Sequence, residues 1–152
     1  MERKCCALLI VKQVLGRELC TQEGRAAAHS LIYLVQEVLG VKLGYRFRWL
    51  ARGPYSRALS TDLRTLNPCT CSDPAAVELP RELSLKLSTL RVGLAKALTI
   101  AASYVMLKKD VYPPIGDVAG EVARRFKVPR AVVVEVAELL SQYLRRAKPS
   151  YS

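Results

Sequence analysis

The sequence predicts a mainly α-helical, winged-helix-like fold, in which about five to six helices accompany one short β-strand or wing element. Apolar residues recur at helical spacing along most of the chain, and this spacing changes to strict alternation only at residues 45–49. A length of 152 residues is close to the common size of one domain. We therefore expect a single domain over residues 1–152, with subdomains at 1–66 and 81–146.

Two helices are predicted before the alternating segment. Residues 3–15 carry apolar side chains on more than one helical face and stop at Gly16, so we expect a well-buried helix. Residues 24–39 have one apolar face, and Gly40 supplies the stop. The apolar face of this second helix consists of Ala27, Leu31, Leu34, Val35 and Val38.

Aromatic residues and arginines alternate along residues 45–49, which predicts a half-buried strand with the aromatics packed inward and the arginines in water. Stacking of the aromatics on single-stranded bases is the alternative to a role in the core. Gly53-Pro54 is expected to break the strand. Ser56 then caps a helix that runs to Leu66, or else Gly53 caps it with Pro54 at the first helical position.

The second half begins with a predicted linker over residues 67–80, which carry three prolines. Helical spacing follows over residues 81–105, with a break at Gly93. Residues 83–87 also alternate as a strand would, but the length of the pattern favours a helix.

The last two predicted helices, 117–126 and 130–146, resemble a helix-turn-helix. Ala123 permits a close crossing and Val128 is expected to plug the turn, although the usual turn glycine is missing. A structural helical hairpin, a DNA-reading helix and a partner interface are the three interpretations. The side chains expected to stay exposed are Lys127, Arg130 and Glu135.

Positive charge is concentrated in one stretch of the chain. The formal net charge is +11, and residues 42–64 hold six cationic side chains against one acidic side chain. Cationic surfaces attract polyanions because binding releases condensed counterions, and arginine forks match phosphate oxygens. We predict a nucleic-acid-binding patch, with a plain solvated face as the alternative. The predicted contacts are Arg46, Arg48, Arg52, Arg57, Arg64, Lys127 and Arg130.

Motifs for catalysis are missing from the sequence. His29 is the one histidine, and its neighbours on the predicted helix indicate a structural role. No catalytic triad order, paired-carboxylate motif or phosphate-binding glycine loop is present. The cysteine pairs lack the spacing of a zinc site. We therefore expect no enzymatic activity, no cofactor and no metal.

The chain contains one asparagine and four glutamines, and this depletion of thermolabile side chains indicates a thermophile. Disulfides are then plausible even in a cytoplasmic protein. One or two disulfides would join the N-terminal cysteines to the C-x-C pair, with buried free thiols as the alternative. The longest apolar region, 83–107, contains three cationic residues, so we expect no membrane span and a cytoplasmic location. The candidate cysteines are Cys5, Cys6, Cys20, Cys69 and Cys71.

The segment from Arg25 to Leu63 resembles the YwgA-like uncharacterised proteins of archaea and bacteria, which are distantly similar to the Panacea domain of antitoxin and adaptor-like proteins. The shared features are the helix around His29, the Tyr-x-Phe-x-Trp alternation and the Gly-Pro-Tyr-Ser turn. The resemblance implies a mainly helical fold and a non-enzymatic, interaction-based role. Arg52 departs from the pattern, which often has an aromatic residue there. The structural motif that the resemblance implies consists of Gly53, Pro54, Tyr55, Ser56, Leu59 and Asp62.

Together these features predict a small basic nucleic-acid-binding protein, regulatory or defence-related, with DNA favoured over RNA as its partner. Its arginine-rich wing would contact phosphates. The alternative is a non-enzymatic interaction module, antitoxin-like or adaptor-like, that binds an acidic protein or a second copy of itself. No membrane partner is expected.

Overall fold

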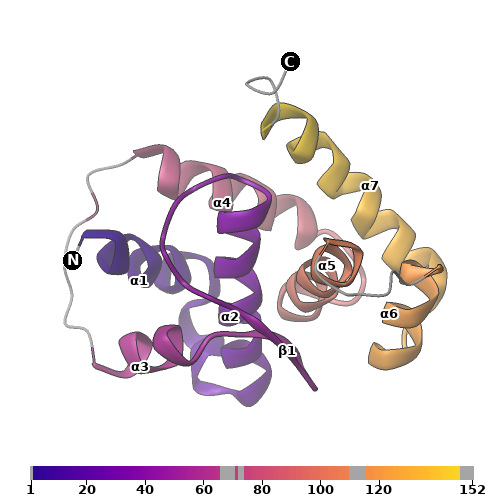
Figure 1. Cartoon of the computed structure of the whole chain (residues 1–152), viewed down its shortest axis with the longest axis horizontal. Coiled ribbons are helices and arrows are strands. Elements are labelled where there is room, and N and C mark those ends of the chain that lie inside the picture. The colour runs from indigo at the N-terminus through magenta and orange to yellow at the C-terminus, as the bar shows by residue number, and fades with distance from the viewer. Residues whose placement is uncertain (1, 66–70, 72–73, 110–115, 148–152) are drawn as a thin grey trace.

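The computed structural model describes residues 2–65, 71, 74–109 and 116–147 (Figure 1). Over these residues the chain forms seven α-helices, one short 3-10 helix and a two-stranded antiparallel sheet. The predicted class, a helical protein with a short β element, is confirmed, with at least one more helix than expected. None of the described helices is long and apolar enough to cross a membrane.

Helices α1 (Glu2–Leu15) and α2 (Gln22–Glu37) flank the 3-10 helix η1 (Gly16–Cys20). The α2 helix begins earlier than predicted because Thr21 caps it: the Thr21 hydroxyl accepts a hydrogen bond from the Gly24 backbone N–H at 2.9 Å. This cap satisfies one of the free N–H groups of the first turn.

Strand β1 (Arg48–Leu50) pairs with β2 (Gly53–Tyr55) in a tight hairpin. The prediction that Gly53-Pro54 breaks the strand is wrong, because these residues are two of the three residues of the second strand. Trp49 lies opposite Pro54, a residue that lacks an N–H but is tolerated on the edge strands of a two-stranded sheet. The observed strand, Arg48–Leu50, therefore overlaps only the C-terminal end of the predicted strand at 45–49.

Tyr45 lies outside the hairpin ladder and is held by a side chain. Its backbone N–H donates to Gln36 Oε1 at 2.9 Å, and Gln36 Nε2 donates to its backbone carbonyl at 3.0 Å. The Gln36 amide thus pairs with Tyr45 as a neighbouring strand would. This explains why an alternating pattern extends beyond the strand itself.

Helix α3 (Arg57–Thr65) starts at Ser56, whose hydroxyl accepts from the Leu59 N–H at 3.2 Å. The predicted cap at Ser56 is confirmed. The alternative start at Gly53-Pro54 is wrong, because both residues belong to β2.

Helices α4 (Pro74–Leu87) and α5 (Leu94–Lys109) occupy the predicted helical region after the first loop. The linker prediction is wrong from Pro74 onward: Pro74 is the first helical residue, where a missing N–H costs nothing, and Pro80 lies within α4. The helix prediction over residues 83–87 is confirmed, and so is the break at Gly93, because α4 ends at Leu87 and α5 begins at Leu94.

The last two helices, α6 (Val118–Phe126) and α7 (Arg130–Ala147), match the prediction closely. Lys127 takes the left-handed conformation between them, with φ 57°, so a lysine fills the position that a glycine usually occupies. The Val128 N–H donates to the Ala123 carbonyl at 3.0 Å and closes the turn, with Val128 partly buried.

The core is built around α2 and α5, which pack side by side at the centre (Figure 1). Helices α6 and α7 cover α5 on one side, while α1, α3 and α4 gather on the other side of the molecule. The buried apolar residues of these elements form one cluster. The hairpin contacts both central helices, and this contact fixes its position on the core.

Candidate functional site

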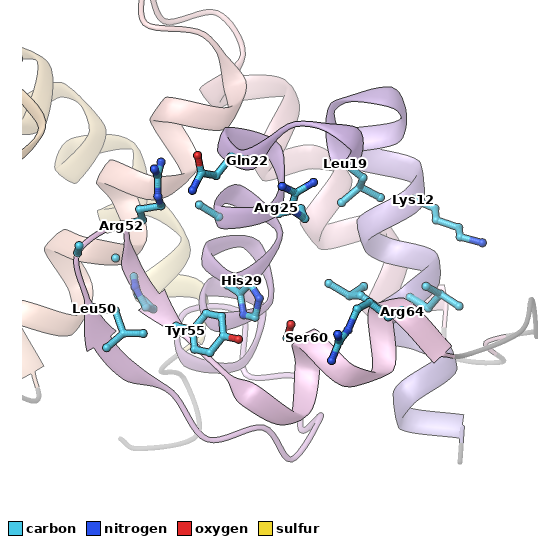
Figure 2. A pocket seen from close by; sticks show the side chains of 16 residues that line it. Lys12, Leu19, Gln22, Arg25, His29, Leu50, Arg52, Tyr55, Ser60 and Arg64 are labelled. Atoms are coloured by element: carbon cyan, nitrogen blue, oxygen red, sulfur yellow. The ribbon is translucent and has the colours of Figure 1, made fainter.

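A cleft of about 670 Å³ opens between α1, η1, α2, the hairpin and α3 (Figure 2). Leucines from four different elements form its apolar walls. One of these leucines, Leu50, is 44% exposed although it is a large hydrophobic residue. Concave, partly apolar surfaces of this volume are typical of ligand-binding sites. The apolar wall residues include Leu8, Leu19, Leu50 and Leu63.

Among the residues that the structure describes, four cationic side chains and no carboxylate line this cleft. Lys12 comes from α1, Arg25 from α2, Arg52 from the hairpin turn and Arg64 from α3, so the charges lie on different sides of the opening (Figure 2). Two of the four, Arg52 and Arg64, belong to the predicted nucleic-acid contacts. Lys12 and Arg25 escaped prediction because both lie far from residues 42–64 in the sequence and join the group only through tertiary packing.

His29 fastens the turn at the inner wall of the cleft. Its Nδ1 accepts a hydrogen bond from the Ser56 backbone N–H at 3.1 Å, and its ring stacks on Tyr55 with 4.4 Å between centroids. Burial lowers the pKa of His29 to about 4, so the ring is neutral near pH 7. Since Nδ1 accepts, the ring proton resides on Nε2.

Gly53 is required by its surroundings. Its φ of +107° is unfavourable for residues with a side chain, and a Cβ there would lie 3.0 Å from the Ser103 hydroxyl of α5. The hairpin can therefore approach the central helices closely only with glycine at this position. This explains the first residue of the Gly-Pro-Tyr-Ser motif.

The remaining motif residues also hold the turn in place. Asp62 of α3 accepts a hydrogen bond from the Tyr45 hydroxyl at 2.7 Å, and Lys4 Nζ lies 3.8 Å from its other oxygen. Burial, together with this bond, raises the pKa of Tyr45 well above its ordinary value. Leu59 is fully buried. The motif therefore connects α3 and the preceding segment to the core.

The five predicted arginines of residues 46–64 are all exposed, and none forms an ion pair within the part of the chain that the structure describes. The other two predicted contacts lie at the α6–α7 turn. Lys127 is exposed there, whereas Arg130 pairs with Asp117 at 3.2 Å. The five unpaired side chains are Arg46, Arg48, Arg52, Arg57 and Arg64.

The aromatic residues of the alternating segment pack inward as predicted. Tyr45 is buried, Phe47 meets Tyr33 edge-on at 5.4 Å, and Trp49 is partly buried. The Arg125 guanidinium lies over the Trp49 ring, 5.1 Å from its centroid. This contact brings the end of α6 against the hairpin and occupies a ring face that a base would need.

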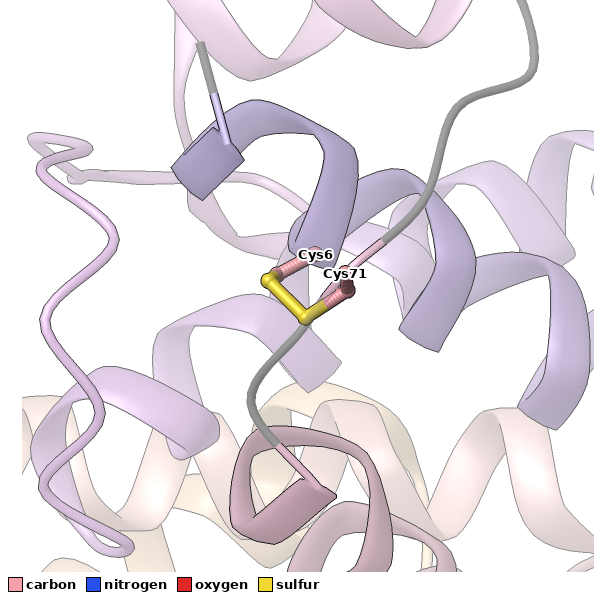
Figure 3. Close-up of a disulfide and its surroundings, with 2 residues drawn as sticks. All are labelled: Cys6 and Cys71. Carbon is pink, nitrogen blue, oxygen red and sulfur yellow. A yellow bond between two sulfur atoms is a disulfide. The ribbon is translucent and has the colours of Figure 1, made fainter.

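A disulfide joins Cys6 of α1 to Cys71 (Figure 3), with 4.8 Å between the two Cα atoms. The predicted link between the two cysteine groups is confirmed for this pair, and the free-thiol alternative is wrong for it. Cys5 is also disulfide-bonded, Cys20 is free and exposed, and Cys69 lies outside the described residues.

The described residues contain no cluster of three or more His, Cys, Asp or Glu side chains that could hold a metal ion. Comparisons with protein-family models, with curated proteins and with solved structures gave no match.

Proposed function

We propose that this protein binds nucleic acid, with phosphates contacting the arginines of the hairpin and α3. The observation that supports the proposal most directly is the set of five exposed arginines without an ion pair among the described residues. Guanidinium groups in this state are available for bidentate bonds to phosphate oxygens.

The hairpin register places this charge beside the cleft. Directly paired residues of an antiparallel sheet project on the same face, so Arg48 shares a face with Tyr55, and Leu50 shares it with Gly53. Tyr55 and Leu50 both line the cleft. The face of Arg48 therefore continues into the cationic opening, and the two form one basic surface.

Charge reversal tests the proposal. In the variant Arg46→Glu/Arg48→Glu, affinity for labelled oligonucleotides should fall about tenfold or more at low salt, and the slope of log K against log salt should decrease by about 2. Fluorescence anisotropy over a salt series measures both quantities. Circular dichroism of the variant should be unchanged, because both side chains are exposed.

The matched control is Arg81→Glu/Arg91→Glu, which makes the same change in net charge. Arg81 and Arg91 are exposed on α4 and in the turn after it, and α4 packs on α1, α5 and α7 without lining the cleft. We expect this control to change affinity much less. Equal losses in both variants, or no binding stronger than about 1 mM in the wild type, would contradict the proposal.

A further inference from the structure

The cleft combines apolar walls, polar groups and a cationic opening in a way that the surface arginines alone do not explain. Its volume of about 670 Å³ lies in the range of pockets for small organic ligands. The stacked rings of His29 and Tyr55 form part of one wall, and Leu50 lies near them (Figure 2). Such walls suit the flat faces of a planar, partly apolar ring.

The inner wall also carries a polar group that needs a partner. His29 is 5% exposed and Nδ1 is already bonded, while Nε2–H makes no hydrogen bond to another described residue. Gln22 and Ser60 add an amide and a hydroxyl to the lining. Nε2 is not one of the fully buried side-chain atoms that lack a partner, so water can reach it. An occupant that displaces this water without offering an acceptor loses about 1–3 kcal/mol, so the occupant should carry acceptors as well as an apolar face.

We infer that the cleft holds one unpaired nucleotide of a single-stranded nucleic acid, with the base inside and its flanking phosphates at the cationic opening. This inference rests on the proposed function and specifies its substrate class. A base supplies both the planar face and the hydrogen-bond acceptors, whereas the apolar side chain of an acidic peptide would leave the His29 donor unpaired.

The distribution of charge agrees with a strand that crosses the opening. Lys12, Arg25 and Arg64 lie on three separate helices around it, and Arg52 adds a fourth charge from the hairpin turn. Phosphates on both sides of an inserted base would each meet a cation. A duplex cannot place a base in the cleft without unpairing it, which costs a few kcal/mol. The protein should therefore prefer single strands.

Two matched pairs of variants test the inference. Leu50→Ser removes an exposed cleft wall, and Leu85→Ser removes an equally large residue that is 62% exposed on α4. Gln22→Glu places a negative charge at the cleft, and Gln142→Glu makes the same change on α7. All four positions are exposed, so the variants should fold, which circular dichroism and thermal unfolding can verify.

Wild-type affinity for a labelled single-stranded 12-mer should exceed its affinity for the blunt duplex about tenfold. Leu50→Ser should weaken single-strand binding about fivefold and leave duplex binding nearly unchanged. Gln22→Glu should weaken binding of both, and single-strand binding by the larger factor, because its charge lies where the base and its phosphates would enter. Leu85→Ser and Gln142→Glu should affect neither. Nucleoside monophosphates should compete at concentrations where inorganic phosphate does not.

Equal affinity for single strands and duplex, with no effect of the cleft variants, would overturn the inference and leave the proposed function intact. An absence of binding to any nucleic acid would overturn both. Binding of an acidic, leucine-containing peptide that Leu50→Ser abolishes, without competition by monophosphates, would assign the cleft to a protein partner and overturn the inference.

Discussion

The hairpin region and the α6–α7 region carry similar residues and use their charges differently. At α6–α7, Arg124 pairs with Glu121 and Arg130 with Asp117. In residues 46–64, the one acidic side chain, Asp62, is mostly buried and bonded to Tyr45, which leaves the arginines without acidic partners among the described residues. A count of charges in the sequence therefore indicates which cations are free to bind a partner only after the internal pairs are known.

The two regions also differ in how their backbone is held. The backbone of α6–α7 is held by regular helical hydrogen bonds, by the N-cap at Asp117 and by the closed turn at Lys127. The hairpin region consists of two three-residue strands and α3, and an imidazole and a carboxylate attach it to the rest of the molecule, while the Cys6–Cys71 disulfide closes the chain around it. Specific polar and covalent contacts should therefore matter more for its stability.

Removal of the disulfide should have the largest effect on stability. The Cys6–Cys71 bond spans 65 positions, and a loop of this length corresponds to about 4 kcal/mol in the chain-entropy description. Because Cys5 is disulfide-bonded as well, the variant Cys5→Ala/Cys6→Ala/Cys71→Ala, which removes both bonds, should lose about this much free energy of unfolding in a denaturant titration. Cys20→Ala, at an exposed free thiol, is the control and should unfold like the wild type. A triple variant as stable as the wild type would show that these disulfides contribute nothing.

Acidification should destabilise the hairpin region through His29. Its pKa in the folded protein, about 4, lies below the ordinary 6.5, so the unfolded chain binds a proton first as the pH falls. The stabilisation is complete above about pH 6.5 and should be lost progressively toward pH 4, by about 3 kcal/mol. Urea titrations across this range measure the loss.

The control for this pH dependence is His29→Asn, which keeps an acceptor near the position of Nδ1 for the Ser56 N–H. This variant should be less stable than the wild type at pH 8, because it lacks the ring stacked on Tyr55. Between pH 6.5 and 4 its stability should decline less than that of the wild type. Parallel pH profiles of the two proteins would show that His29 is not the titrating group.

Loss of the Tyr45 hydroxyl should have a smaller effect. Tyr45→Phe removes the bond to Asp62 and leaves a mostly buried carboxylate with only the distant Lys4 amine, at an expected cost of about 1–2 kcal/mol. Tyr104→Phe on α5 removes a hydroxyl that accepts only an exposed bond from Lys108, and should cost less. Thermal unfolding of both variants measures the two losses, and equal melting temperatures would contradict the prediction that Tyr45→Phe is the more destabilising change.

Neutralisation of the paired arginines should have the smallest effect. Arg124→Gln/Arg130→Gln should change oligonucleotide affinity less than about twofold, because each of these charges already faces a carboxylate. Fluorescence anisotropy measures the oligonucleotide affinity of this variant in parallel with that of Arg46→Glu/Arg48→Glu. A loss as large as that of Arg46→Glu/Arg48→Glu would assign the α6–α7 turn to the binding surface and remove the contrast between the two regions.

Periodicity predicted the helical class, the break before Gly93 and the last two helices, because these features depend on local sequence. It failed at β2, where a Gly-Pro pair that normally interrupts a strand lies on the edge of a hairpin. The inward direction of Tyr45, Phe47 and Trp49 was also predictable. The side-chain pairing of Gln36 with Tyr45 was not, since it joins segments nine residues apart through an amide.

The candidate site was predictable only in part. The five arginines could be found because they lie close together in the sequence. The cleft itself depends on α1, η1, α2, α3 and the hairpin meeting in space, so Lys12 and Arg25 carried no signal. The pairing of Arg130 with Asp117 across 13 positions was equally hidden, because either residue alone is an ordinary surface charge.

The bond between Cys6 and Cys71 makes residues 6–71 a covalently closed ring, and every residue that lines the cleft, from Leu8 to Arg64, belongs to this ring. A protease that cuts the backbone once inside the ring therefore cannot release either fragment while the bond is intact. The two pieces stay tethered and can close again around the same cleft, so a nicked molecule should separate on a gel only after reduction.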